Sequence, residues 1–150
     1  EPTTALDVTI QAQVLELIKD LQKQVKTSML LITHDLGIVA ETCDSVAIMY
    51  AGRLVEYADI EHLYGNPLHP YTQGLFDAVP DLESPIGEKL SVIHGLPPDP
   101  TNLPRGCSFS PRCPYAQKEC LEKPCGMREI EPGHFIDCYF PHPYEGGSRA

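Results

Sequence analysis

The sequence predicts a mixed α/β domain that continues into an irregular, cysteine-rich extension. Between residues 14 and 25, apolar side chains recur at the spacing of an amphipathic helix. Short apolar runs typical of strands follow up to about residue 60. From Asn66 onward prolines become frequent, and five of the six cysteines lie between Cys107 and Cys138. We therefore expect two regions with different physical properties.

The first sixty residues predict the order helix, strand, helix, strand, strand. Asp7 or Thr9 could cap the first helix. The run "SMLLIT" (28–33) is short, apolar and closed by threonine, which is typical of a buried parallel strand. A second helix is expected at about Leu36 to Thr42, and "SVAIMY" and "RLVEYA" predict two strands that meet in a turn at Ala51-Gly52. This order is that of the second half of an α/β domain.

Charge and hydropathy exclude two classes of function for this sequence. It has 11 Lys and Arg against 21 Asp and Glu, a net charge of -10, so it lacks the positive surface that binds phosphate backbones. Nucleic acid is therefore excluded as the main partner. No stretch reaches the roughly 20 apolar residues that a membrane-spanning helix needs. Any membrane association is expected to go through a partner.

Two motifs carry a resemblance to a known family. The chain opens with "EPTTALD", and "LLITHDL" follows at residues 30–36. Together they resemble the ATP-binding subunits of ABC transporters. The resemblance implies that Glu1 is the Walker B glutamate and the general base. It also implies that Ala5 to Asp7 is the D-loop, with Asp7 contacting the partner subunit, and that His34 is the switch histidine.

The chemistry of phosphoryl transfer explains these residue types. A carboxylate such as that of Glu1 orients the attacking water, and an imidazole such as that of His34 donates a hydrogen bond to the γ-phosphate. Taken singly, Glu1 is also compatible with an exposed terminal residue, Asp7 with a helix cap and His34 with a bystander.

Several motifs of the family are absent from the sequence. It contains no G-x-x-x-x-G-K-[ST] phosphate loop, no Gln-loop and no Ser-Gly-Gly signature. We therefore expect a C-terminal part of a P-loop ABC nucleotide-binding domain that starts at the Walker B glutamate and is inactive alone. ATP and Mg²⁺ would bind the parent chain.

The stretch "GNPLHPYTQGLFDAVPD" (65–81) resembles the oligopeptide and dipeptide importers of this family. His69-Pro70 predicts the start of a short helix, because proline at the first helical position loses no needed hydrogen bond. These residues are also compatible with a purely structural role, in which they pack the extension against the core and bind no ligand. The resemblance implies that residues 1–80 are the C-terminal part of the ATP-binding core and residues 81–150 the importer extension.

The cysteines of the extension have three interpretations. Disulfides are uncommon in a reducing cytosol, and zinc usually takes paired C-x2-4-C knuckles, which only Cys120 and Cys125 approach. The resemblance implies the third, a [4Fe-4S] cluster, with zinc as the alternative. Its implied ligands are Cys107, Cys113, Cys120 and Cys138.

Three residues near these ligands are left out of the predicted site. Cys125 departs from the family pattern, which puts the fourth ligand in doubt. His134 and His142 are left out because a histidine in a Gly/Pro-rich loop is more often a surface residue.

The resemblance implies an ATPase subunit that energises peptide import, peripheral on the cytoplasmic face of the membrane. Its implied partners are transmembrane permease subunits, a second ATP-binding subunit and, indirectly, an external peptide-binding protein. The cargo, whether dipeptide, oligopeptide or metal chelate, is left open, as is the purpose of the cluster. The alternative is a metal-binding regulatory or interaction module without an ATPase role.

Overall fold

A computed structural model describes residues 6–79 and 91–144 of the chain. The chain divides into two compact units, residues 1–44 and 45–150. The expected boundary near residue 80 lies at the edge of the described residues and stays a prediction.

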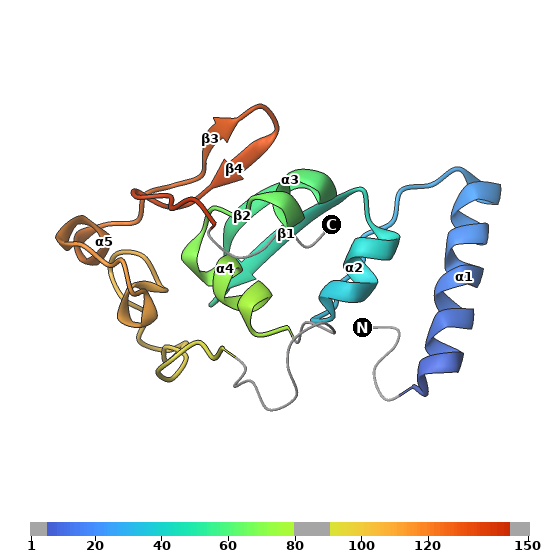
Figure 1. Cartoon of the computed structure of the whole chain (residues 1–150), viewed down its shortest axis with the longest axis horizontal. Coiled ribbons are helices and arrows are strands. Elements are labelled where there is room, and N and C mark those ends of the chain that lie inside the picture. Colours follow the sequence, from blue (N-terminus) through green and yellow to red (C-terminus); the bar gives the residue numbers. More distant parts are fainter. Residues whose placement is uncertain (1–5, 80–90, 145–150) are drawn as a thin grey trace. The chain divides into compact units, whose positions relative to one another are not determined.

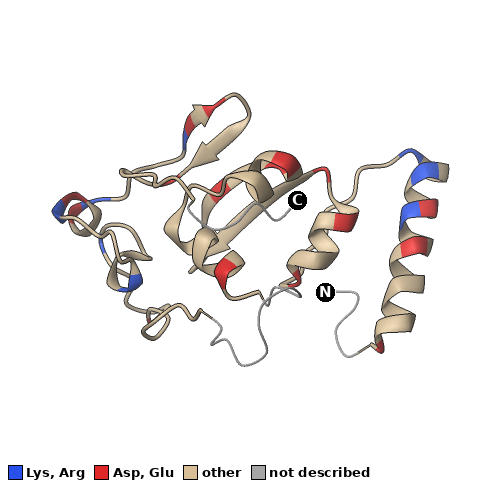
Figure 2. Ribbon diagram, viewed as in Figure 1, with Lys and Arg blue, Asp and Glu red and all other residues tan. Residues whose placement is uncertain are grey.

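Two helices make up the regular structure of the first unit, α1 (Val8–Val25) and α2 (Leu36–Thr42), as the sequence predicts (Figure 1). Asp7 is the cap of α1, because its side chain accepts a hydrogen bond from the Thr9 amide at 2.9 Å. Side chains of both charge signs lie along α1 (Figure 2). The Lys19 ammonium donates to the Glu41 carbonyl at 2.7 Å, which connects the two helices.

The strand expected at residues 28–33 is not formed, and this prediction was wrong for the structure. The segment is extended without strand pairing, and Leu30 and Ile32 are 88% and 69% exposed. In the part of the chain that the structure describes, all strands belong to the second unit. A buried parallel strand needs neighbouring strands that pair with its backbone and further elements that cover its side chains on the faces of the sheet. The apolar run has no neighbouring strand among the described residues of its unit.

The second unit contains a four-stranded sheet in the order β1-β2-β4-β3, with every pair antiparallel. Its strands are β1 (Ser45–Tyr50), β2 (Arg53–Asp59), β3 (Arg128–Glu131) and β4 (His134–Ile136). The turn between β1 and β2 is at Ala51-Gly52 as predicted, with φ of 48° and 75°. Positive φ at both positions suits a tight hairpin turn.

The extension is more regular than the sequence predicts. Its β3-β4 hairpin joins the sheet through β4, which pairs with β2 at Glu56↔Ile136 and Tyr57↔Phe135 (Figure 1). The expectation of a wholly irregular extension is therefore corrected. Sequence patterns did not reveal β4, because three residues are too few to show alternation.

Short helices complete the second unit. They are α3 (Ile60–Gly65), α4 (Pro70–Asp77), the 3-10 turn η1 (Ser110–Arg112) and α5 (Lys118–Glu122). Helix α4 begins at His69-Pro70, as predicted, with His69 as its cap. None of the helices in the described ranges is long and apolar enough to cross a membrane.

Phe109 anchors the cysteine-bearing loop to the core of the second unit. It is 2% exposed, and its ring centroid lies 5.2 Å from that of Tyr50 in β1 and 5.4 Å from that of Tyr71 in α4. Arg112 adds a polar connection, because its guanidinium donates to the Tyr50 hydroxyl at 3.2 Å and to the Ile93 carbonyl at 2.8 Å. These contacts place the loop against the end of β1 and the start of α4.

Candidate functional site

The residues predicted to act on nucleotide belong to the first unit or lie outside the described residues. Glu1 falls among the latter. Asp7 is exposed and caps α1. His34 is exposed and directly precedes Asp35, which caps α2 by accepting hydrogen bonds from the Gly37 and Ile38 amides at 2.9 and 3.2 Å. The nucleotide roles of Glu1, Asp7 and His34 stay predictions.

Five cysteines line one pocket in the second unit, which we call the cysteine pocket. It is lined by Cys107, Cys113, Cys120, Cys125 and Cys138 with His69, Pro70, Phe109, Ser110, Tyr115, Asp137, Tyr139 and Phe140. The cysteines come from the loops on either side of η1, from α5 and the segment after it, and from the segment after β4. The fold thus gathers all four predicted ligands and also Cys125.

The backbone around Gly106 holds two of these segments together. The Cys107 amide donates to the Cys120 carbonyl at 2.8 Å. A Cβ atom at Gly106 would lie 2.1 Å from the same carbonyl oxygen. Only glycine permits this close approach. Cys107 and Cys120 are therefore positioned by backbone contacts as well as by side-chain packing.

The thiols of the pocket are poorly solvated. Burial raises the pKa of the Cys113 thiol to about 11 and that of the Cys138 thiol to about 12, and it also raises the pKa of Cys107. Nearby backbone amides oppose this effect and lower the thiol pKa: those of Phe109 and Ser110 at Cys107, that of Tyr115 at Cys113 and that of Phe140 at Cys138. These donors are suited to stabilise negative charge on sulfur.

The cysteines of the pocket are free thiols that are not arranged around a metal ion. All six cysteines of the chain are free. Among the described residues, no group of three or more His, Cys, Asp and Glu side chains is arranged to hold one metal ion. The arrangement supports neither the [4Fe-4S] cluster nor the zinc alternative, and both stay predictions.

His69 belongs to the pocket, although the sequence predicts it only as the start of a helix. Its side chain is 1% exposed and lines the cysteine pocket. Its Nδ1 accepts a hydrogen bond from the Tyr71 amide at 3.0 Å. Burial lowers the pKa of the imidazole to about 4. The one sequence feature that singled out His69 was the His-Pro pair at the start of a predicted helix.

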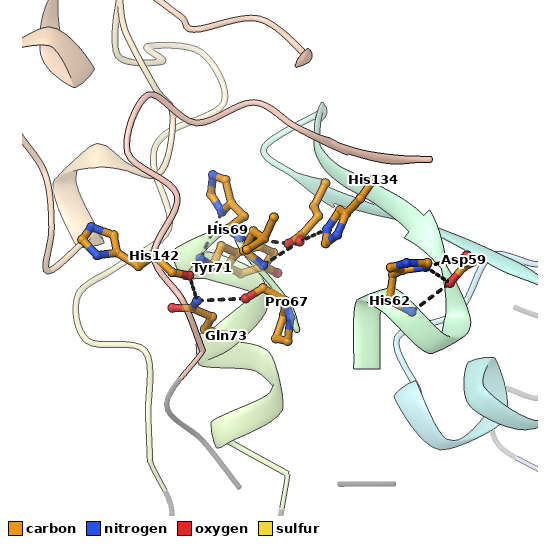
Figure 3. Close-up of polar contacts among 10 residues, drawn as sticks. Asp59, His62, Pro67, His69, Tyr71, Gln73, His134 and His142 are labelled. Carbon is orange, nitrogen blue, oxygen red and sulfur yellow. Dashed lines mark hydrogen bonds and ion pairs between the residues drawn. The ribbon is translucent and has the colours of Figure 1, made fainter. Parts of the chain in front are cut away.

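A buried acidic group contacts His69, which lines the pocket, and His134, and both histidines are drawn in Figure 3. Glu56 in β2 is fully buried, and its carboxylate accepts from the amides of Leu68 and His69 at 2.7 and 3.0 Å. The ring Nε2 of His134 in β4 lies 2.7 Å from Oε1 of the same carboxylate. His134 is fully buried, so the prediction that it is a surface residue was wrong. Its burial depends on strand pairing that short sequence windows do not encode.

Comparisons with known proteins show to which family this chain is similar. Residues 55–120 match the family described as "Oligopeptide/dipeptide transporter, C-terminal region". Over 143 residues, the chain is 50% identical to the oligopeptide transport ATP-binding protein OppD of Bacillus subtilis. The matched region makes up 95% of this chain and 40% of that protein. The chain is homologous to the C-terminal region of such ATP-binding subunits. The resemblance drawn from the sequence motifs is confirmed.

Two further relatives extend this homology. AppD, an oligopeptide transport ATP-binding protein of Bacillus subtilis, is 51% identical over all 150 residues, which are 45% of its length. OppD of Salmonella typhimurium is 46% identical over 141 residues, which are 94% of this chain and 42% of that protein. The chain thus spans less than half the length of these relatives. The family match contains Cys107, Cys113 and Cys120 and ends before Cys125 and Cys138.

Proposed function

We propose that this chain is part of the ATP-hydrolysing subunit that energises ABC-type import of peptides. The observation that carries the proposal is homology along nearly the whole chain to proteins named for oligopeptide transport and ATP binding. The subunit would be peripheral on the cytoplasmic face of the membrane. It would pair with a second ATP-binding subunit and act on transmembrane permease subunits, with an external peptide-binding protein delivering the cargo.

The proposed mechanism assigns a different task to each of three residues. The Glu1 carboxylate orients a water molecule toward the γ-phosphate and takes up its proton. The His34 imidazole donates a hydrogen bond to a γ-phosphate oxygen, and the Asp7 carboxylate contacts the second subunit. The sequence contains no phosphate loop, so phosphate and Mg²⁺ binding belongs to other residues of the complete subunit.

The decisive test replaces Glu1 by Gln in the complete subunit. We expect Glu1→Gln to abolish ATP turnover and to retain ATP binding, because the amide keeps the size of the side chain and loses its basicity. Phosphate release and nucleotide affinity are the measurements. Glu16→Gln, on α1, is the matched control and should leave both unchanged. Turnover near the wild-type rate in Glu1→Gln would remove Glu1 from the mechanism.

We also infer that the cysteine pocket binds a [4Fe-4S] cluster through Cys107, Cys113, Cys120 and Cys138. The basis of this inference is that these thiols converge on one pocket and that backbone amides lie near three of them. When bound, such a cluster supplies a one-electron centre and a covalent connection between the loops. Cys125 lines the same pocket but is not assigned as a ligand, in keeping with the family pattern.

Cysteine substitution in anaerobically purified protein tests this ligand set. We expect Cys→Ser at each of the four assigned positions to abolish the brown colour and the bound iron, because serine is a poor ligand for iron in such clusters. Iron and sulfide analysis is the measurement, and Cys125→Ser is the matched control that should keep both. A requirement for Cys125 and not for Cys138 would contradict the ligand set. Stoichiometric zinc in anaerobic wild-type protein would contradict the cluster itself.

A further inference from the structure

Short-range contacts fix the backbone on both sides of His34. The Asp35 amide donates to Thr33 Oγ1 at 3.1 Å, which closes a turn of three residues with His34 at its centre. Beyond His34, Asp35 Oδ1 accepts from the Gly37 and Ile38 amides at 2.9 and 3.2 Å and caps α2. His34 therefore lies between a residue held by a side-chain hydroxyl and the start of a helix.

The hydrogen bond of Thr33 limits the directions in which the His34 side chain can leave the backbone. Peptide groups are planar, so the bond from Cα to Cβ of His34 turns with its φ and ψ angles alone. The ring that the Thr33–Asp35 hydrogen bond closes contains both of these angles. While the bond holds, the imidazole is reoriented mainly through its own χ1 and χ2. The Thr33 hydroxyl thus helps to select the position of the ring.

The turn at His34 does not depend on strand pairing. Thr33 ends the apolar run 28–33, which has no strand beside it among the described residues of its unit. The bond joins residues two positions apart, so it forms whether or not other segments pair with that run. Thr42 in α2 is the contrast within the unit, because its buried Oγ1 has no hydrogen-bond partner in the part of the chain that the structure describes.

We propose that Thr33 is a positioning residue for ATP hydrolysis, whose hydroxyl acts through the Asp35 amide to direct the His34 imidazole toward the γ-phosphate. The inference rests on the proposed function, which gives His34 its contact with the γ-phosphate. A donor to a transferring phosphoryl group accelerates the reaction only when it is already in place. Loss of the turn should therefore slow hydrolysis. ADP has no γ-phosphate and should bind as before.

The experiment uses the complete subunit and compares two substitutions of Thr33. Thr33→Val keeps the shape of the side chain and removes the hydroxyl, whereas Thr33→Ser keeps the hydroxyl. Thr42→Val is the matched control, because it makes the same change at a hydroxyl without a described partner. His34→Ala and the double variant Thr33→Val/His34→Ala complete a double-mutant cycle. Phosphate release at saturating ATP and the affinity for ADP are measured.

We expect Thr33→Val to lower kcat about threefold to tenfold, the range for the loss of one ordinary hydrogen bond, and to leave ADP affinity unchanged. Thr33→Ser and Thr42→Val should keep the wild-type rate. In the His34→Ala background, Thr33→Val should lower the rate no further, because Thr33 acts only through His34.

Three results at Thr33 would overturn the inference and leave the role of His34 intact. A wild-type kcat in Thr33→Val would show that the turn is not needed. A loss that Thr33→Ser does not restore, or that comes with weaker ADP binding, would give Thr33 a structural role. The same loss in the His34→Ala background would separate Thr33 from His34. A wild-type rate in His34→Ala would instead overturn the proposed role of His34, and this inference with it.

Discussion

At the scale of single residues, the second unit depends on a buried carboxylate. Glu56 has no exposed surface, and three donors surround it: the amides of Leu68 and His69 and the ring of His134. A buried carboxylate is tolerated only when its oxygens are satisfied in this way. Glu56 therefore connects β2 with β4 and with the segment that begins α4, next to the cysteine pocket.

We predict that Glu56→Gln loosens this connection. One carboxylate oxygen becomes an NH₂ group, so at least one of the three donors loses its acceptor, at a cost of about 1–3 kcal/mol. Hydrogen exchange at the Leu68 and His69 amides should become faster. Glu129→Gln is the matched control, because Glu129 is exposed and its contact with the Gly133 amide survives as an amide oxygen. Equal exchange rates in wild type and Glu56→Gln would contradict the role of Glu56.

At the scale of elements, the approach of α5 to the loop before η1 requires a residue without a side chain. Gly106 lies where a Cβ atom would be 2.1 Å from the Cys120 carbonyl oxygen and 2.8 Å from the Leu121 carbonyl carbon. Both obstacles are backbone atoms, so they cannot move as a flexible side chain would. With a side chain at this position, the helix and the loop would have to separate.

We predict that Gly106→Ala impairs the cysteine pocket. The overpacked contact should cost about 1–3 kcal/mol and weaken the hydrogen bond from the Cys107 amide to the Cys120 carbonyl. Iron content of anaerobic protein and protease resistance of the extension should both fall. Gly65→Ala is the control, because nothing lies within 4 Å of a Cβ atom there. Wild-type iron content in Gly106→Ala would show that the loop can adjust.

At the scale of the whole molecule, the two units differ in how well they cover their apolar side chains. The first unit exposes many of them, namely Leu6, Val8, Ile10, Leu17, Leu21, Val25, Leu30 and Ile32. Extended apolar surface of this kind usually contacts another part of a protein. The second unit instead buries Leu63, Phe109 and Ile136 almost completely. We expect other segments of the complete subunit to cover the first unit.

We predict that the 150-residue chain alone releases no phosphate from ATP. The sequence contains no phosphate loop. It therefore lacks the lysine and the backbone amides with which such a loop would hold the β- and γ-phosphates near Glu1 and His34. Phosphate release should be measured for the chain alone beside the complete subunit. Turnover by the chain alone that is lost in Glu1→Gln would show that binding elements other than a phosphate loop suffice.

The sequence by itself determined the features that depend on neighbouring residues. The Asp7 cap, helix α2, the turn at Ala51-Gly52 and the start of α4 at His69-Pro70 were all predicted, because caps, turns and proline act within a few residues. The cysteines were also identified as one group, since their spacing is visible in the chain.

Tertiary structure alone decided the features that depend on distant partners. The run at residues 28–33 has the composition of a strand but no described strand beside it, so it stays unpaired. Glu56 and His134 are 78 residues apart in sequence, and neither is identifiable as buried until β2 pairs with β4. His69 joins the cysteine pocket for the same reason. Local patterns encode backbone conformation, whereas burial and pairing depend on which segments the whole fold brings together.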